Sequence, residues 1–164
     1  MGHRDTAEAE IRRLQNAGEA EICARMMAGS EPWMTLGRDF DASLAIISDP
    51  SREVYLATAN GRILGFVVLL MQGVFVGYVQ SIYVEPAWRG QGIGSQLMAF
   101  VEQRIFAEVP NAFICVSSFN SGARRLYERL GYEEVGELRD WIISDHSEIL
   151  LRKTIAPLTE FKKR

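Results

Sequence analysis

Apolar residues near the start of the chain follow two different periods. Around Ile11 and Leu14 they alternate with polar residues, which predicts a short edge strand. Along residues 19–27 and 39–47 they recur three and four positions apart, as on one face of a helix. Asp49-Pro50 ends the second segment, because the residue before a proline is biased away from helical geometry. The N-terminal third is therefore expected to be mostly helical.

The centre of the chain predicts a sheet. Residues 54–58 and 63–71 flank Asn60-Gly61, and this dipeptide between two apolar runs is a strong signal for a β-hairpin. The run over 63–71 is apolar nearly throughout, as expected of a strand that helices cover on both faces. A third strand is expected over residues 78–84, just before Glu85-Pro86.

The second half of the chain alternates between helical and strand patterns. Its longest amphipathic segment is a predicted helix over residues 92–109. The order of elements predicts an α/β fold with a mixed sheet of about six to seven strands and helices on both faces, in a single domain over residues 1–164. The other expected elements are a strand over 113–116, a helix over 121–130 that Gly131 ends, and strands over 133–138 and 149–152.

Composition excludes several classes of protein. Hydrophobic residues make up 48% and charged residues 24%, as in a folded globular protein and unlike a disordered one. The net charge of −3 argues against nucleic-acid binding through a basic surface. The cysteines are Cys23 and Cys115 and the histidines are His3 and His146, too few for a disulfide framework or for metal-ligand spacing, so no metal is expected.

Neither a membrane span nor a targeting segment is visible in the sequence. The longest apolar run, residues 63–71, is too short to cross a bilayer. Asp5, Glu8 and Glu10 occupy the region where a secretory signal would have its apolar run. We therefore expect a cytoplasmic protein with no membrane partner.

A glycine-rich turn joins the predicted strand over 78–84 to the long helix that follows. Gly90, Gly92 and Gly94 allow the backbone to approach a ligand closely and leave successive N–H groups free. The start of the helix adds partial positive charge, and Arg89 adds a formal one. Such a turn is suited to hold a phosphate group.

The spacing within this turn distinguishes between phosphate-binding motifs. A P-loop needs a Lys-Ser/Thr pair after its second glycine, and a dinucleotide fingerprint needs glycine where the chain has Ser95 or Leu97. The turn instead matches Arg/Gln-x-x-Gly-x-Gly/Ala at Arg89, Gly92 and Gly94, and so resembles the pyrophosphate loop of the GNAT superfamily of N-acetyltransferases. Taken alone, it could also be a turn that only joins a strand to a helix.

A second motif downstream supports the same resemblance. Asn120, Ala123 and Tyr127, followed by Gly131-Tyr132, are similar to the superfamily's Asn-x-x-Ala-x-x-x-Tyr and Gly-Phe/Tyr pattern. On a helix, Ala123 and Tyr127 share a face. Tyr127 could instead pack on the core, and Asn120 could be a plain N-cap. The two motifs occur in the expected order, and the resemblance is strongest over residues 54–152.

The resemblance implies a mixed, mostly antiparallel sheet and a direct transfer. An acetyl group would move from acetyl-CoA, a co-substrate, to an amine through a tetrahedral intermediate. The amine would be a protein N-terminus, a lysine or a small molecule, and the protein a monomer or homodimer. Tyr127 would be the general acid near the CoA sulfur. The residues that would bind acetyl-CoA are Ile82, Tyr83, Val84, Arg89, Gly90, Gln91, Gly92, Ile93, Gly94, Ser95, Asn120 and Tyr127.

The resemblance does not supply a general base. Tyr78 and Cys115 occupy positions where relatives have glutamate. A base acting through water, or an amine that arrives neutral, fits as well, and a catalytically degenerate acyl-CoA-binding sensor or scaffold is an alternative function. Other titratable candidates, each also consistent with a structural or exposed role, are Glu31, Glu85, Asp140, His146 and Glu148.

Two further features bear on the acceptor and on the chemistry. Trp33 and Trp141 are expected at the mouth of the acceptor site, where aromatic rings suit a cationic amine, although both could simply cover the core. Cys115 lies between Ile114 and Val116, which predicts a buried small hydrophobe and no covalent role.

Overall fold

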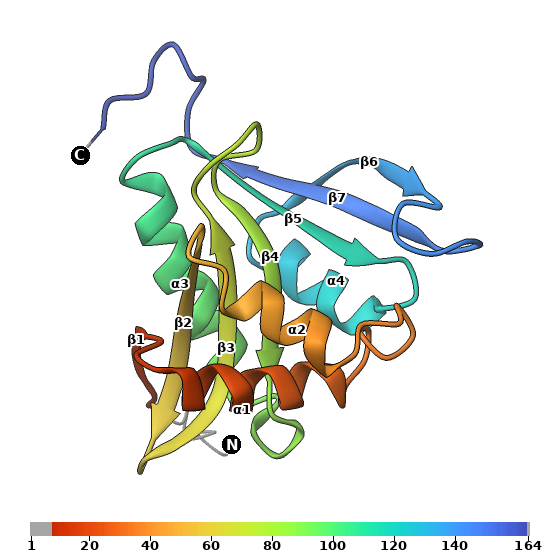
Figure 1. The fold of residues 1–164 in the computed structure, drawn as a ribbon. Coiled ribbons are helices and arrows are strands. Elements are labelled where there is room, and N and C mark those ends of the chain that lie inside the picture. Colours follow the sequence, from red (N-terminus) through yellow and green to blue (C-terminus); the bar gives the residue numbers. More distant parts are fainter. Residues whose placement is uncertain (1–7, 164) are drawn as a thin grey trace, which may run out of the picture.

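A seven-stranded mixed sheet runs through the molecule in the order β1-β2-β3-β4-β5-β7-β6 (Figure 1). The computed structural model describes residues 8–163, so His3 and Asp5, which entered the sequence expectations, lie outside the described residues. All strand pairs are antiparallel except β4 with β5. The elements are β1 Glu10–Arg13, α1 Ala17–Ala28, α2 Phe40–Ile47, β2 Arg52–Ala59, β3 Arg62–Leu70, β4 Tyr78–Val84, the short 3-10 helix η1 Pro86–Trp88, α3 Ile93–Phe106, β5 Asn111–Ser117, α4 Ser121–Arg129, β6 Glu133–Arg139 and β7 Ser147–Thr154.

These elements confirm the α/β class and the mostly antiparallel sheet. Each helix and strand expected from the sequence is present near its predicted bounds. The clearest difference is α3, which ends at Phe106 and not at Val109. Val109 precedes Pro110, and the proline ring disfavours helical geometry at the residue before it. The single domain over residues 1–164 stays a prediction.

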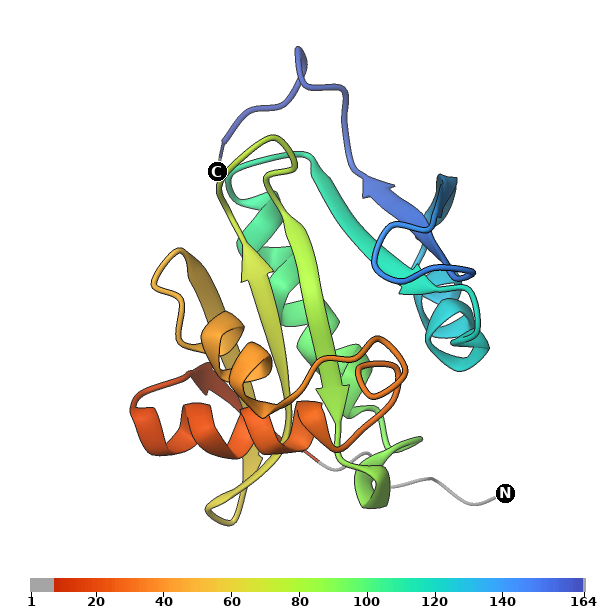
Figure 2. The same cartoon turned by 45° about the vertical axis from the view of Figure 1, so that its right-hand side comes forward.

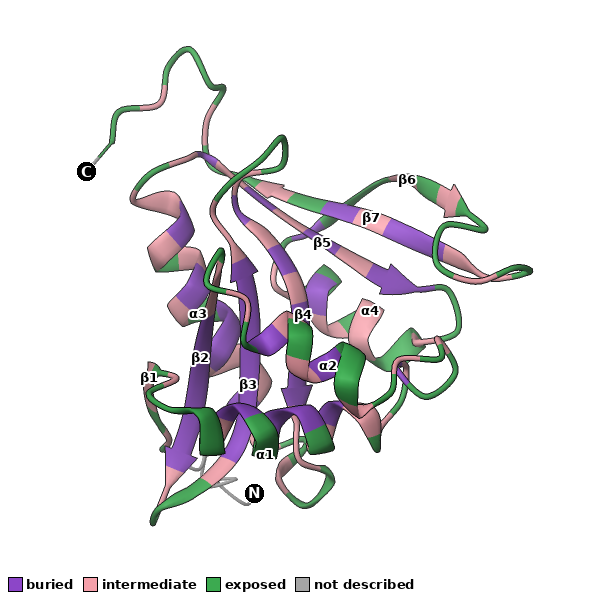
Figure 3. Cartoon of the chain, in the orientation of Figure 1, coloured by how far each residue is buried: buried purple, intermediate pink, exposed green. Residues whose placement is uncertain are grey.

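Helices cover the two faces of the sheet and bury a separate apolar cluster on each (Figure 3). Helix α1 turns Ala20, Cys23, Ala24 and Met27 toward one face, as its spacing predicts. On the other face, α3 packs Ile93, Leu97, Met98, Val101 and Ile105 against the strands. Strands β2 and β3 contribute to both clusters, which explains why the sequence of β3 is apolar nearly throughout.

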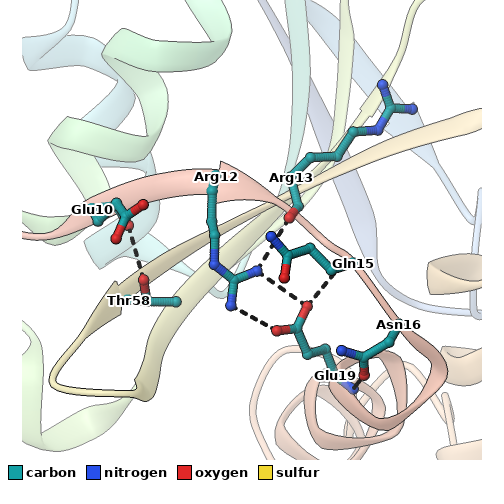
Figure 4. Close-up of polar contacts among 7 residues, drawn as sticks. All are labelled: Glu10, Arg12, Arg13, Gln15, Asn16, Glu19 and Thr58. Carbon is teal, nitrogen blue, oxygen red and sulfur yellow. Dashed lines mark hydrogen bonds and ion pairs between the residues drawn. The ribbon is translucent and has the colours of Figure 1, made fainter.

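Polar contacts fix the start of α1 against the edge strand (Figure 4). Asn16 caps the helix, its side chain accepting a hydrogen bond from the Glu19 backbone N–H at 3.0 Å. The Glu19 carboxylate accepts the Gln15 N–H at 2.8 Å and forms an ion pair with Arg12 of β1 at 2.6 Å. These contacts join β1 to α1 at the turn between them.

The sheet opens between β4 and β5, its one parallel pair. Only Tyr78 with Phe113 and Val79 with Ile114 are in register there, and beyond them the described strands diverge (Figure 2). The pairing of β4 with β3 also shifts register near Gln80. The backbone of residues 80–84 therefore faces a gap on the β5 side.

Residues 8–163 contain neither a helix suited to span a membrane nor a cluster of metal ligands. No helix in that range combines the length and the apolar character needed to cross a membrane. No group of three or more histidine, cysteine or acidic side chains there could hold a metal ion.

Candidate functional site

Two cavities meet where β4 and β5 diverge. The large cavity has a volume of about 670 Å³ and the small cavity about 260 Å³. Six residues line both, namely Pro32, Trp33, Ile82, Asn120, Ala123 and Tyr127. The two cavities are therefore adjacent, and Tyr127 is one of the residues between them.

The large cavity contains most of the positions that the sequence motifs single out. These are Ile82, Tyr83, Val84, Arg89, Gly90, Gly92, Gly94, Ser95, Asn120 and Tyr127. Two expected positions do not line it: Ile93 is buried in the core, and the Gln91 amide donates a hydrogen bond to the Ala87 carbonyl oxygen at 3.0 Å. Gln91 and Ile93 could contribute only backbone groups to a ligand.

The glycine turn requires glycine at two of its positions. Gly90 has φ 73° and Gly92, the N-cap of α3, has φ 87°, a left-handed geometry that other residues rarely adopt. Gly94 is different, because it lies within the helix and a Cβ there would sit 3.4 Å from the Leu126 side chain, in ordinary contact. The first N–H groups of α3 lie at the cavity wall, where the helix dipole favours an anion.

Arg89 holds the other end of this turn. Its Nε donates a hydrogen bond to the Val84 carbonyl oxygen at 3.0 Å, which fixes the side chain at the end of β4. The remaining guanidinium nitrogens stay exposed beside the large cavity. Arg89 can therefore add positive charge next to the helix N-terminus without a rearrangement.

The second motif folds as its spacing predicts. Asn120 caps α4 by accepting the Ala123 N–H at 3.3 Å, and its amide nitrogen remains available to a ligand. Tyr127 is 4% exposed, and its ring makes an edge contact with Tyr132 at 6.2 Å. Within residues 8–163 the Tyr127 hydroxyl has no hydrogen-bond partner, and burial raises its pKa. Tyr127 is thus both a packing residue and a protonated hydroxyl at the junction of the cavities.

The small cavity brings together side chains from strands that are far apart in the sequence. Tyr78 of β4, Cys115 of β5 and Glu148 of β7 all line it. Burial raises the pKa of Tyr78 and of Cys115, the latter to about 11, and Glu148 raises both further. At neutral pH Cys115 is therefore a thiol, as expected.

The predicted surroundings of Cys115 are wrong. Its neighbours Ile114 and Val116 are buried in the core, but Cys115 points to the opposite side of β5 and is only half-buried. The divergence of β4 from β5 opens that side to the small cavity.

Glu148 is the buried carboxyl that the sequence could not separate from the other candidates. It is 4% exposed and accepts a hydrogen bond from the Ser117 hydroxyl at 2.6 Å. Burial raises its pKa, although the Ser117 hydroxyl and the Arg38 guanidinium each act the other way. A carboxyl with a raised pKa next to a cavity is suited to accept a proton.

The other carboxylates and His146 have local partners or lie elsewhere. Glu31 accepts the Thr35 N–H at 3.1 Å, and Asp140 accepts the Asp145 N–H at 2.7 Å. Glu85 forms an ion pair with Arg62 at 3.7 Å and lines neither cavity. The His146 ring makes a T-shaped contact with the Phe119 ring.

The two tryptophans differ in what they do. Trp33 is 6% exposed, contacts Tyr83 with ring centroids 6.2 Å apart, and lines both cavities with its remaining surface. Trp141 is 53% exposed and lines the small cavity. Trp33 therefore belongs to the core as well as to the site, whereas Trp141 forms part of the rim.

Comparison with known proteins places the fold and the motifs in one family. The model of the acetyltransferase (GNAT) family matches residues 19–132. The aminoalkylphosphonate N-acetyltransferase of Salmonella typhimurium is 35% identical over 102 residues, which are 57% of this chain and 65% of that relative. The N-alpha-acetyltransferase RimI of Mycobacterium tuberculosis is 30% identical over 138 residues, 80% of this chain and 83% of the relative.

A solved structure shows the same fold. The crystal structure of an aminoglycoside 6'-N-acetyltransferase complexed with coenzyme A superposes with a TM-score of 0.73 at 18% identity, covering 90% of this chain and 98% of that one. The match of the family model over more than half of the chain, together with these relatives, shows that the chain belongs to the acetyltransferase (GNAT) family, a family of acetyl-CoA-dependent acyltransferases.

Proposed function

We propose that this protein transfers an acetyl group from acetyl-CoA directly to an amine. The observation that carries the proposal is that the two cavities adjoin at Tyr127, with a glycine turn lining one and a buried carboxyl lining the other. The co-substrate would occupy the large cavity and the amine the small cavity.

The large cavity has features suited to each part of acetyl-CoA. The pyrophosphate would accept hydrogen bonds from the N–H groups of residues 90–95, with Arg89 beside it. The pantetheine arm would lie along residues 82–84 as an added strand, in the gap that β5 leaves. The Asn120 amide nitrogen would donate to the arm from the start of α4. In this pose the thioester would lie near Tyr127.

The side chains at the junction supply two proton transfers. Glu148, as carboxylate, would take a proton from the acceptor ammonium, directly or through water, and the neutral nitrogen would attack the thioester carbon. As the tetrahedral intermediate collapses, the C–S bond breaks and the Tyr127 hydroxyl would give its proton to the departing sulfur. The second proton of the attacking nitrogen would pass to the tyrosine oxygen, directly or through water, which leaves a neutral amide and restores the hydroxyl. The raised pKa of Tyr127 keeps that hydroxyl protonated before the C–S bond breaks.

Turnover against a panel of amines tests the proposal. The panel contains an aminoalkylphosphonate and a peptide with a free N-terminus, because relatives are named for these acceptors, together with a lysine side-chain amine. We expect free CoA thiol in amounts equal to acetylated amine for at least one of the three classes. Acetyl-CoA binding without turnover on any of them would instead support the degenerate sensor or scaffold.

A further inference from the structure

Arg38 is a half-buried cation without a partner. It follows the loop over residues 31–37, and its backbone N–H donates to the Trp33 carbonyl oxygen at 2.9 Å. Its side chain lines the small cavity. Within residues 8–163 its guanidinium makes no hydrogen bond and no ion pair.

The other half-buried arginines of the described chain are all paired. Arg12, Arg52, Arg104 and Arg124 form ion pairs with Glu19, Asp49, Glu53 and Glu128, respectively. A guanidinium that loses water without gaining a partner is costly, and this explains why the four others are paired. Arg38 is the exception, and it is the one that lines the small cavity.

Glu148 lines the same cavity as Arg38 but does not form an ion pair with it. The two charges act on each other across the small cavity, each favouring the charged form of the other. They are not within ion-pair distance, and Glu148 instead accepts its hydrogen bond from Ser117. The small cavity therefore presents one cationic and one anionic side chain to the same ligand space.

We propose that the acceptor is a small molecule carrying both an amine and an acid group, and that Arg38 binds the acid group while the amine faces Glu148. This rests on the proposed acetyl transfer, and it names the acceptor class. A guanidinium holds a carboxylate or phosphonate through two parallel N–H···O bonds. The volume of about 260 Å³ lies below the range of about 300–1,000 Å³ usual for drug-sized ligands, which favours a compact acceptor.

Matched amines test this selectivity. The acid-bearing compounds are 2-aminoethylphosphonate and 3-aminopropanoate, and the neutral compounds are propylamine and ethanolamine. We expect kcat/KM for at least one acid-bearing amine to exceed that of both neutral amines by about tenfold or more, the effect of one charge-assisted contact. The preferred acid distinguishes phosphonate from carboxylate.

Variants of Arg38 assign the effect to this side chain. Arg38→Gln should raise KM for the acid-bearing amine by about tenfold or more, and should lower kcat/KM for propylamine by a smaller factor, because the variant also loses the charge that favours the Glu148 carboxylate. Arg38→Lys, which keeps the charge but loses the fork, should recover part of the loss. The control is Arg13→Gln, the same change at an exposed position on β1, which should alter neither.

Calorimetry keeps the acceptor proposal separate from the proposed reaction. If 2-aminoethylphosphonate or 3-aminopropanoate binds the wild type and not Arg38→Gln, the acceptor site stands even where no acetyl transfer is seen. Equal turnover of acid-bearing and neutral amines, turnover of peptides alone, or no binding of either acid-bearing amine would each overturn it. Thermal unfolding of Arg38→Gln checks that the fold is kept.

Discussion

The walls of the large cavity and of the small cavity are made from different parts of the polypeptide. The large cavity is lined mainly by two continuous segments, residues 82–95 and 119–129, which include Gly90, Gly92, Gly94 and Gly122. The small cavity is lined by side chains from the loop over 31–38, from β4, β5 and β7, and from Trp141-Ile142. The large cavity is therefore built mostly from local segments of the chain, whereas the small cavity depends on how distant segments are brought together.

The prediction with the largest expected effect is at the junction of the cavities. Tyr127→Phe removes the hydroxyl and keeps the ring that packs near Tyr132. Loss of a general acid lowers kcat by about 100- to 10,000-fold, and we expect a value near the middle of that range. Acetyl-CoA affinity measured by calorimetry should hardly change. Wild-type kcat in this variant would restrict Tyr127 to a packing role.

Glu148→Gln tests whether Glu148 of the small cavity is the general base. The amide keeps the shape and can still accept the Ser117 hydrogen bond, but it cannot take a proton. We expect kcat/KM to fall by about 100-fold, since water can replace part of a general base. A Glu148→Gln enzyme as active as the wild type would exclude Glu148 as the base.

The pH dependence gives the same test a second readout. The groups that share the small cavity with Glu148 are Arg38, Tyr78 and Cys115, and none of these three is expected to titrate near neutral pH. Wild-type kcat/KM should therefore rise with pH through the raised pKa of Glu148 and then level off. In the glutamine variant this rise should be absent.

Stability should move in the direction opposite to activity. A carboxyl whose folded pKa is raised stabilises the fold fully below its unfolded pKa, and this contribution is lost as pH rises through the folded pKa. At neutral pH the buried charge of Glu148 therefore opposes folding. In urea unfolding at pH 7, Glu148→Gln should be at least as stable as the wild type. At low pH, its stability relative to the wild type should be lower than at pH 7.

Gly92→Val should impair acetyl-CoA binding in the large cavity and leave the small cavity unchanged. Valine at φ 87° is strained, and its side chain would lie where the pyrophosphate is proposed to bind. We expect acetyl-CoA affinity to fall by about tenfold or more. Gly61→Val is the matched control, because Gly61 has φ 74° in the hairpin between β2 and β3 and no part in either cavity. Equal CoA affinities in the two variants would remove the turn from the site.

Cys115→Ala should have the smallest effect. The thiol has a pKa of about 11, so it is a poor nucleophile at neutral pH, and direct transfer does not need it. We expect activity within a fewfold of wild type and a loss of about 1 kcal/mol of stability. Mass spectrometry after incubation with acetyl-CoA alone should find no acetyl group on Cys115. A stoichiometric adduct that an amine removes would replace direct transfer by a covalent route.

The same difference between the cavities explains what could be predicted from the sequence. The glycine turn and the Asn120 to Tyr127 helix are local motifs, so their residues and spacing could be read before the fold was known. Glu148 lines the site only because β7 pairs with β5 and places it opposite Ser117, a long-range register that spacing does not reveal. Cys115 was misjudged for a related reason, since its apolar neighbours on β5 say nothing of a neighbouring strand that diverges.

The divergence of β4 and β5 also bears on how long the protein survives. Within residues 8–163, two residue pairs join β1–β4 to β5–β7 along the sheet, and α3 bridges the two parts on one face. A co-substrate that supplies backbone-like hydrogen bonds along residues 82–84 would act as a removable strand. By mass action, a ligand at 100 times its Kd stabilises the folded chain by about 2.7 kcal/mol. The supply of acetyl-CoA would thus set the protein's resistance to unfolding and proteolysis, and loss of the co-substrate would shorten its lifetime.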